Sequence, residues 1–117
     1  MSNFKRQRVK DETHEDFIRA LPCCIPMCGD NTSTEAAHVS YAEPRIGKFG
    51  RGKGQKEESI WVVPLCGRHH AEQHARGNER AWWRDRNVDP CRLAAGLYLR
   101  TGDYQTALQI IDAQIAD

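Results

Sequence analysis

The chain has 117 residues, a formal net charge of +1 and 39% hydrophobic residues, which favours one small domain with a modest core. A mean hydropathy of −0.72 and the lack of an apolar run of about eighteen residues argue against a membrane protein, and we expect a cytoplasmic chain without a signal peptide. Five cysteines, an odd number, favour reduced thiols and metal binding over disulfides.

The N-terminal region is predicted to be an arm followed by a short helix. Residues 1–12 are polar and basic, and we expect a flexible arm. Thr13 begins a helix with Phe17 and Leu21 on one face, and Pro22 ends it. His14 in this helix is expected at the surface.

A cysteine-rich turn follows at residues 23–28, Cys-Cys-Ile-Pro-Met-Cys. Cys24 and Cys28 have three residues between them, a spacing within the range of a zinc knuckle, and Gly29 permits the tight turn behind them. Cys23 competes for the same role, because adjacent cysteines rarely bind one ion together. We favour Cys24.

Two strands are predicted, one on each side of a glycine-rich loop. Residues 36–40 hold His38 among small apolar neighbours, and residues 59–65 are rich in β-branched and aromatic side chains. Residues 44–58 between them would close an antiparallel hairpin. This loop is either a solvated linker or a segment that binds phosphates through its cations and glycine amides, and composition supports both interpretations equally. Its cations are Arg45, Lys48, Arg51, Lys53 and Lys56.

Residues 67–76 are predicted to form a helix that carries metal-binding side chains. Cys66 and His69 have the two-residue spacing of half a tetrahedral zinc site. His70 and His74 are four positions apart and therefore share a helix face, where two imidazoles can bind one metal ion. Gly77 is a natural residue to follow the helix end.

The last third of the chain is predicted to be helical. Asn78 caps a helix over residues 79–86, Asp89 with Pro90 begins a second, and Asp103 caps the last. Cys91 is expected to be a plain buried thiol. The last helix has an apolar stripe that serves the core or a contact between two copies in a homodimer. The stripe consists of Tyr104, Ala107, Leu108, Ile111 and Ile115.

Taken in order, these features are a cysteine pair, a histidine strand, a basic loop, a second strand and Cys-x-x-His-His-x-x-x-His on a helix. This order resembles the HNH (ββα-metal) endonucleases, and within them the small phage and prophage type related to recombination-enhancement nucleases. The resemblance covers roughly residues 20–90. It implies an α+β fold, with a zinc-stapled ββα-metal core over residues 13–90 and a helical extension over residues 91–117.

The resemblance also implies a metal-dependent DNA endonuclease, bacterial or phage-encoded, with DNA as its partner. His38 matches the general base of the family. His70 matches a ligand of the catalytic divalent metal (Mg²⁺, Mn²⁺, Ni²⁺ or Zn²⁺), and His74 matches a second ligand of that ion. The structural zinc ligands would be Cys24, Cys28, Cys66 and His69.

The chain departs from the family pattern at two positions. Ala37 stands where the family usually has an Asp or His that binds the catalytic metal. The middle Asn that orients the base is also missing, with Glu58, Ser59 and Trp61 in that neighbourhood. The alternative is therefore a non-catalytic zinc module that binds DNA or protein on the same scaffold.

Overall fold

The structure, a computed structural model, describes residues 11–41 and 59–114. The predicted N-terminal arm is almost wholly outside these ranges, as are the loop cations Arg45, Lys48, Arg51, Lys53 and Lys56. Within the described ranges the fold is α+β, with a two-stranded antiparallel sheet and five α-helices. The expected class is confirmed at this level.

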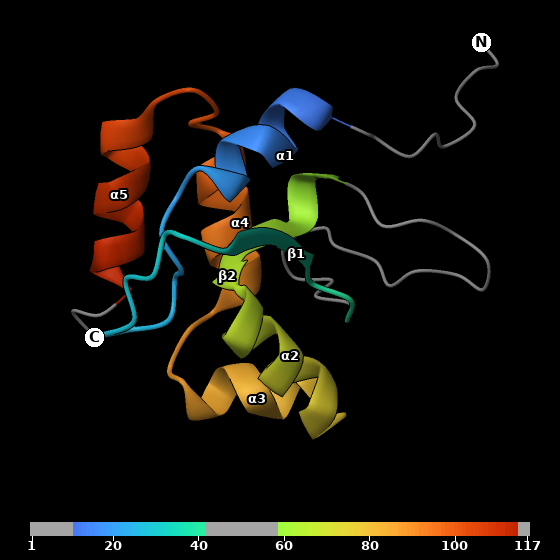
Figure 1. Ribbon diagram of the computed structural model, residues 1–117. Coiled ribbons are helices and arrows are strands. Elements are labelled where there is room, and N and C mark those ends of the chain that lie inside the picture. The colour runs from blue at the N-terminus through green and yellow to red at the C-terminus, as the bar shows by residue number, and fades with distance from the viewer. Residues whose placement is uncertain (1–10, 42–58, 115–117) are drawn as a thin grey trace, which may run out of the picture.

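The elements follow the predicted order closely (Figure 1). The side chains of Asn78, Asp89 and Asp103 accept a backbone N–H as N-caps of their helices, and Gly77 follows its helix with a φ of 79°. The bounds are α1 Glu12–Arg19, β1 Thr34–His38, the 3₁₀ helix η3 Ser59–Trp61, β2 Val62–Cys66, α2 Gly67–Arg76, α3 Glu79–Asp85, α4 Pro90–Tyr98 and α5 Tyr104–Ala113.

The hairpin lies at the centre of the molecule. Its register pairs Thr34 with Cys66 and His38 with Val62. Every residue of β2 is buried, because α1 contacts both strands and α4 packs against β2. In Figure 1, α2 and α3 extend from one end of the hairpin, while α5 lies against α4. A strand covered on both faces needs no alternation of polar residues, which explains the apolar run of β2.

One continuous core joins the hairpin to the C-terminal helices. Ile18 of α1, Leu65 of β2, Leu97 of α4 and Ile111 of α5 belong to the same buried cluster. Cys91 is 1% exposed, as expected for a plain buried thiol. No helix among the described residues is long and apolar enough to span a membrane.

His14 is buried, so the expected surface position is wrong. Its Nδ1 lies 2.7 Å from the Thr101 hydroxyl oxygen, and that hydroxyl donates to the Tyr98 carbonyl. The Thr101 oxygen therefore accepts the proton of Nδ1, which sets the tautomer. The Tyr98 ring covers the imidazole edge at 4.8 Å. Within the described part of the chain, His14 Nε2 is buried without a hydrogen-bond partner.

Burial lowers the pKa of His14 from its ordinary value of 6.5, although Asp11 and Glu15 act in the opposite direction. The folded state then binds fewer protons than the unfolded chain, so stability is full above pH 6.5 and falls as the pH drops below that value. We expect His14→Asn to remove this pH dependence. The unfolding free energy of the parent should change by at most about 1.4 kcal/mol per pH unit more than that of the variant. Urea unfolding of parent and variant across this range measures it. An unfolding free energy that changes equally with pH in parent and variant would contradict the lowered pKa of His14.

Candidate metal centre

Backbone hydrogen bonds within residues 23–30 hold the cysteine turn. The Cys23 N–H donates to the Asp30 carbonyl at 2.9 Å, and the Cys28 N–H donates to the Ile25 carbonyl at 3.0 Å. Met27 and Gly29 have φ values of 72° and 64°, in the left-handed region that allows the chain to turn sharply.

The other half of the centre comes from the junction of β2 with α2. Cys66 ends the strand and is the N-cap of the helix, and its Sγ accepts the His69 N–H at 3.5 Å. The positive end of the helix dipole favours an anionic group at this position. The Cys-x-x-His spacing thus places both side chains on the first turn of α2.

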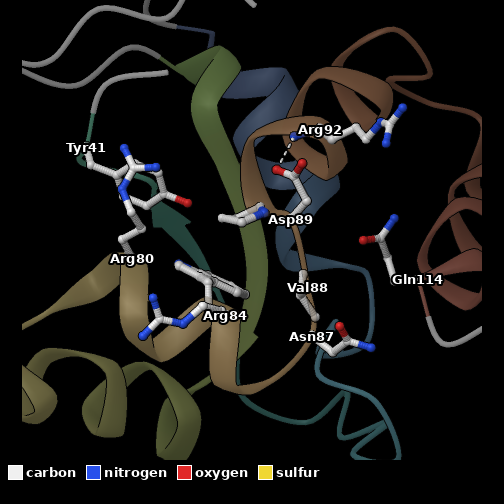
Figure 2. A pocket seen from close by; sticks show the side chains of 10 residues that line it. Tyr41, Arg80, Arg84, Asn87, Val88, Asp89, Arg92 and Gln114 are labelled. Atoms are coloured by element: carbon white, nitrogen blue, oxygen red, sulfur yellow. Dashed lines mark hydrogen bonds between the residues drawn. The ribbon is translucent and has the colours of Figure 1, made fainter. Parts of the chain in front are cut away.

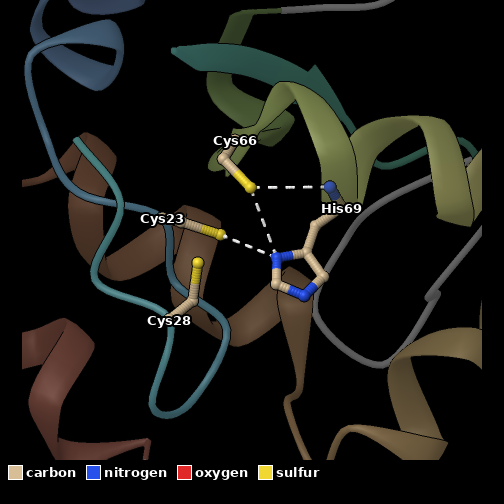
Figure 3. Close-up of side chains that lie close together, drawn as sticks. All are labelled: Cys23, Cys28, Cys66 and His69. Atoms are coloured by element: carbon tan, nitrogen blue, oxygen red, sulfur yellow. Dashed lines mark hydrogen bonds between the residues drawn. The ribbon is translucent and has the colours of Figure 1, made fainter. Parts of the chain in front are cut away.

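These two halves meet in a cluster formed by Cys23, Cys28, Cys66 and His69 (Figure 3). The four ligand atoms lie within 4.8 Å of one another. His69 Nδ1 is 3.4 Å from Cys66 Sγ and 3.5 Å from Cys23 Sγ. Zinc bonds of about 2.3 Å to sulfur and 2.0–2.1 Å to nitrogen separate the two ligands of a tetrahedron by about 3.5 Å. The cluster therefore fits a tetrahedral metal ion.

Cys23 occupies the position in the cluster that the sequence analysis assigned to Cys24. The prediction of Cys24 as a ligand was therefore wrong. The Cys24 N–H donates to the Pro64 carbonyl of β2 at 2.9 Å. This bond holds Cys24 against the strand with its side chain in the hydrophobic core, at 1% exposure. Cys23 therefore contributes its thiol to the cluster, and Cys24 does not.

Burial changes the pKa values of two members of the cluster, Cys23 and His69. Burial raises the pKa of Cys23 to about 12 and lowers the pKa of His69. Without a metal the Cys23 thiol is therefore protonated, and a bound ion must displace that proton. The His69 imidazole is already in the neutral form that binds metals.

A second polar chain joins α2 to β1. His70 and His74 lie on one helix face as expected, with their Nε2 atoms 3.2 Å apart. His70 Nδ1 is 2.5 Å from Glu35 Oε1. Sequence reasoning missed Glu35, although the β1 alternation puts it on the same face as Ala37. His70 contacts Glu35 through Nδ1 and His74 through Nε2. The three side chains therefore form a linear hydrogen-bonded chain, and their polar atoms do not converge on one site.

His38 lies at the end of β1, and alternation turns its side chain to the face opposite Glu35. Its Nε2 is 3.9 Å from the Glu15 carboxylate of α1. Glu15 is buried and accepts the Ser59 hydroxyl at 2.6 Å. His38 therefore contacts α1. That it shares a cleft with His70 and His74 stays a prediction.

The chain was also compared with known proteins. A family model described as a protein of unknown function (DUF968) matches residues 1–87. Neither the curated proteins nor the solved structures gave a match.

Proposed function

The chain belongs to the DUF968 family, and we propose that it is a metal-dependent DNA endonuclease with a zinc-stapled ββα-metal core. The observation that carries the proposal is the placement of part of the Cys–His cluster and of a neighbouring histidine pair on one helix. The β1–β2 hairpin leads directly into α2. Cys66 at their junction and His69 on the first turn belong to the buried cluster, whereas His70, the next residue, and His74 form a pair outside it.

The buried cluster would hold a structural zinc ion. It ties the cysteine turn to the first turn of α2, which has only ten residues and would be marginal on its own. A closed set of four protein ligands leaves no open position for a substrate, as in other structural zinc sites. The zinc would thus position His70 and His74 relative to β1.

The second ion would bind to His70 and His74. Two neutral imidazole nitrogens 3.2 Å apart repel each other unless a proton or a cation lies between their lone pairs. Imidazole ligands suit Zn²⁺ or Ni²⁺ better than Mg²⁺. A divalent metal bound here would stabilise the charge that develops on the scissile phosphate.

Glu35 would compensate for Ala37. The two residues leave β1 on the same face, so a carboxylate is available from the side where the related nucleases carry their Asp or His. Glu35 accepts the Nδ1 proton of His70, which leaves the His70 Nε2 lone pair for a metal. Such carboxylate–histidine pairs hold the ring and raise its basicity.

We therefore expect Glu35→Ala to weaken Ni²⁺ or Co²⁺ binding to the zinc-loaded protein about 10- to 100-fold, the usual effect of removing such a partner. Isothermal titration measures this independently of cleavage. Glu72→Ala is the matched control, since Glu72 lies on α2 between the two histidines but pairs with Arg68 and Arg86. Equal affinities for both variants would contradict the role of Glu35.

His38 would act as the general base. Its side chain is 29% exposed and can meet a substrate, while the buried Glu15 can stabilise the imidazolium that forms. In the reaction a water oxygen bonds to phosphorus, the bond to the leaving oxygen breaks, and His38 takes the water proton.

A second candidate is the non-catalytic zinc module that binds DNA or protein. The orientation of His38 towards Glu15, away from the Glu35 face, favours this alternative. The two candidates differ in whether phosphodiester bonds break. Zinc-loaded protein incubated with supercoiled plasmid and Mg²⁺, Mn²⁺, Ni²⁺ or Zn²⁺ should yield nicked or linear DNA, and only in the presence of added metal. Intact plasmid under all four metals would favour the module.

A further inference from the structure

A cavity of about 470 Å³ lies at the junction of α3 and α4, beside the residues that follow β1 (Figure 2). Its lining includes three arginines and one carboxylate, and the arginines come from two different helices. Arg80 and Arg84 belong to α3, whereas Arg92 and the capping residue Asp89 belong to α4. None of these residues takes part in either metal-binding group described above.

The charged side chains that line the cavity are three arginines and one aspartate, so the lining carries an excess of positive charge. Within the described part of the chain, neither Arg84 nor Arg92 forms an ion pair or a side-chain hydrogen bond. Asp89, the carboxylate in the lining, accepts the backbone N–H of Arg92 at 3.2 Å and so serves as the helix cap (Figure 2). The guanidinium groups of Arg84 and Arg92 thus keep their donors for a ligand.

Other arginines on the helices behave differently. Arg19, Arg68, Arg76 and Arg86 each lie within 3.4 Å of a carboxylate oxygen. Arg80 is held by the Tyr41 ring, with its guanidinium carbon 4.4 Å from the ring centroid. The lining therefore combines one arginine held by an aromatic face with two that have no counter-ion among residues 11–41 and 59–114.

The cavity is also connected to the end of β1, which carries His38. The Ser40 N–H donates to the Glu79 carboxylate of α3 at 3.2 Å, and Tyr41 contacts Arg80, the next residue of the helix. A strand of nucleic acid passing the end of β1 would therefore continue over α3. Planar guanidinium forks match phosphate oxygens better than any other side chain does.

We propose that this cavity binds the backbone of the DNA strand, with Arg84 and Arg92, which extend to opposite sides of Asp89 (Figure 2), each donating to a different phosphate, and with Arg80 beside Arg84. The choice of DNA as the source of the phosphate rests on the proposed function. The contact positions the strand and carries no sequence information, because phosphates are alike at every step.

The test is DNA binding without cleavage. Fluorescence anisotropy of a labelled duplex, with zinc-loaded protein and no other added metal, is measured over a salt series for the parent and for Arg84→Gln/Arg92→Gln. Losing two phosphate contacts should lower the slope of log K against log salt by about 1.8 units and weaken binding at least about tenfold near 0.1 M salt. Arg19→Gln/Arg100→Gln is the control, since it also removes two positive charges and both residues are exposed and lie outside the cavity lining.

Each outcome decides the proposal. A smaller slope for the cavity variant alone supports it. An unchanged slope overturns it, and so does an equal loss in the control, which would indicate only a general charge effect. Inorganic phosphate that binds the parent but not the cavity variant, with DNA binding unchanged in both, would make the cavity a small-anion site and also overturn it. Plasmid cleavage is a separate measurement. The cavity can therefore be shown to bind DNA in a protein that does not cleave it, and a protein that cleaves DNA can be shown not to use the cavity.

Discussion

Cys23→Ser is expected to lose zinc and to leave the domain largely unfolded. Structural zinc sites contribute about 10–16 kcal/mol of apparent binding free energy, whereas a domain of this kind is stable by only about 5–15 kcal/mol. Removing one thiolate of the cluster therefore removes an amount comparable to the whole stability. Zinc content after purification without added metal, together with far-UV circular dichroism, measures both effects, and the parent should carry about one equivalent.

The controls for this experiment are the other two buried cysteines. Cys24→Ala and Cys91→Ser should each retain the parental zinc content, because neither thiol belongs to the cluster. The neighbouring position of Cys24 makes it the sharper control. Zinc lost from Cys24→Ala and kept by Cys23→Ser would reverse the assignment of the ligand.

His38→Ala and His70→Ala are each expected to cut plasmid DNA at least about a hundredfold more slowly than the parent, the usual scale for losing acid–base help. The two losses have different causes. His70→Ala should weaken binding of the second metal, so excess metal should restore part of its rate. His38→Ala should bind that metal with parental affinity and show no such rescue. Initial rates of nicking over a metal titration separate the two.

Glu72→Ala again serves as the control and should cut at the parental rate. If His38→Ala cuts as fast as the parent, His38 is not the general base. That result would not bear on the cysteine cluster or on the His70–His74 pair. Cleavage by neither variant nor parent, under any of the metals, would leave the zinc module as the function. Unchanged zinc content and circular dichroism in both variants are needed to exclude unfolding as the cause.

The sequence by itself determined the features that depend on neighbouring residues. The caps Asn78, Asp89 and Asp103, the turn of Cys66 and His69 and the shared face of His70 and His74 all lie where spacing predicts them. On a helix, residues three and four positions apart meet whatever the rest of the chain does. The same holds for β2, whose β-branched and apolar run predicts a buried strand.

Only the tertiary structure decided which groups meet across the chain. His69 contacts Cys23 over 46 positions, His70 contacts Glu35 over 35, and His14 contacts Thr101 over 87. Local spacing favoured Cys24 and an exposed His14, and both predictions were wrong. The choice between Cys23 and Cys24 depends on one backbone bond to Pro64, and the burial of His14 depends on the helix that ends near Tyr98. Such contacts follow from how helices pack on the hairpin, which no pattern within a few residues contains.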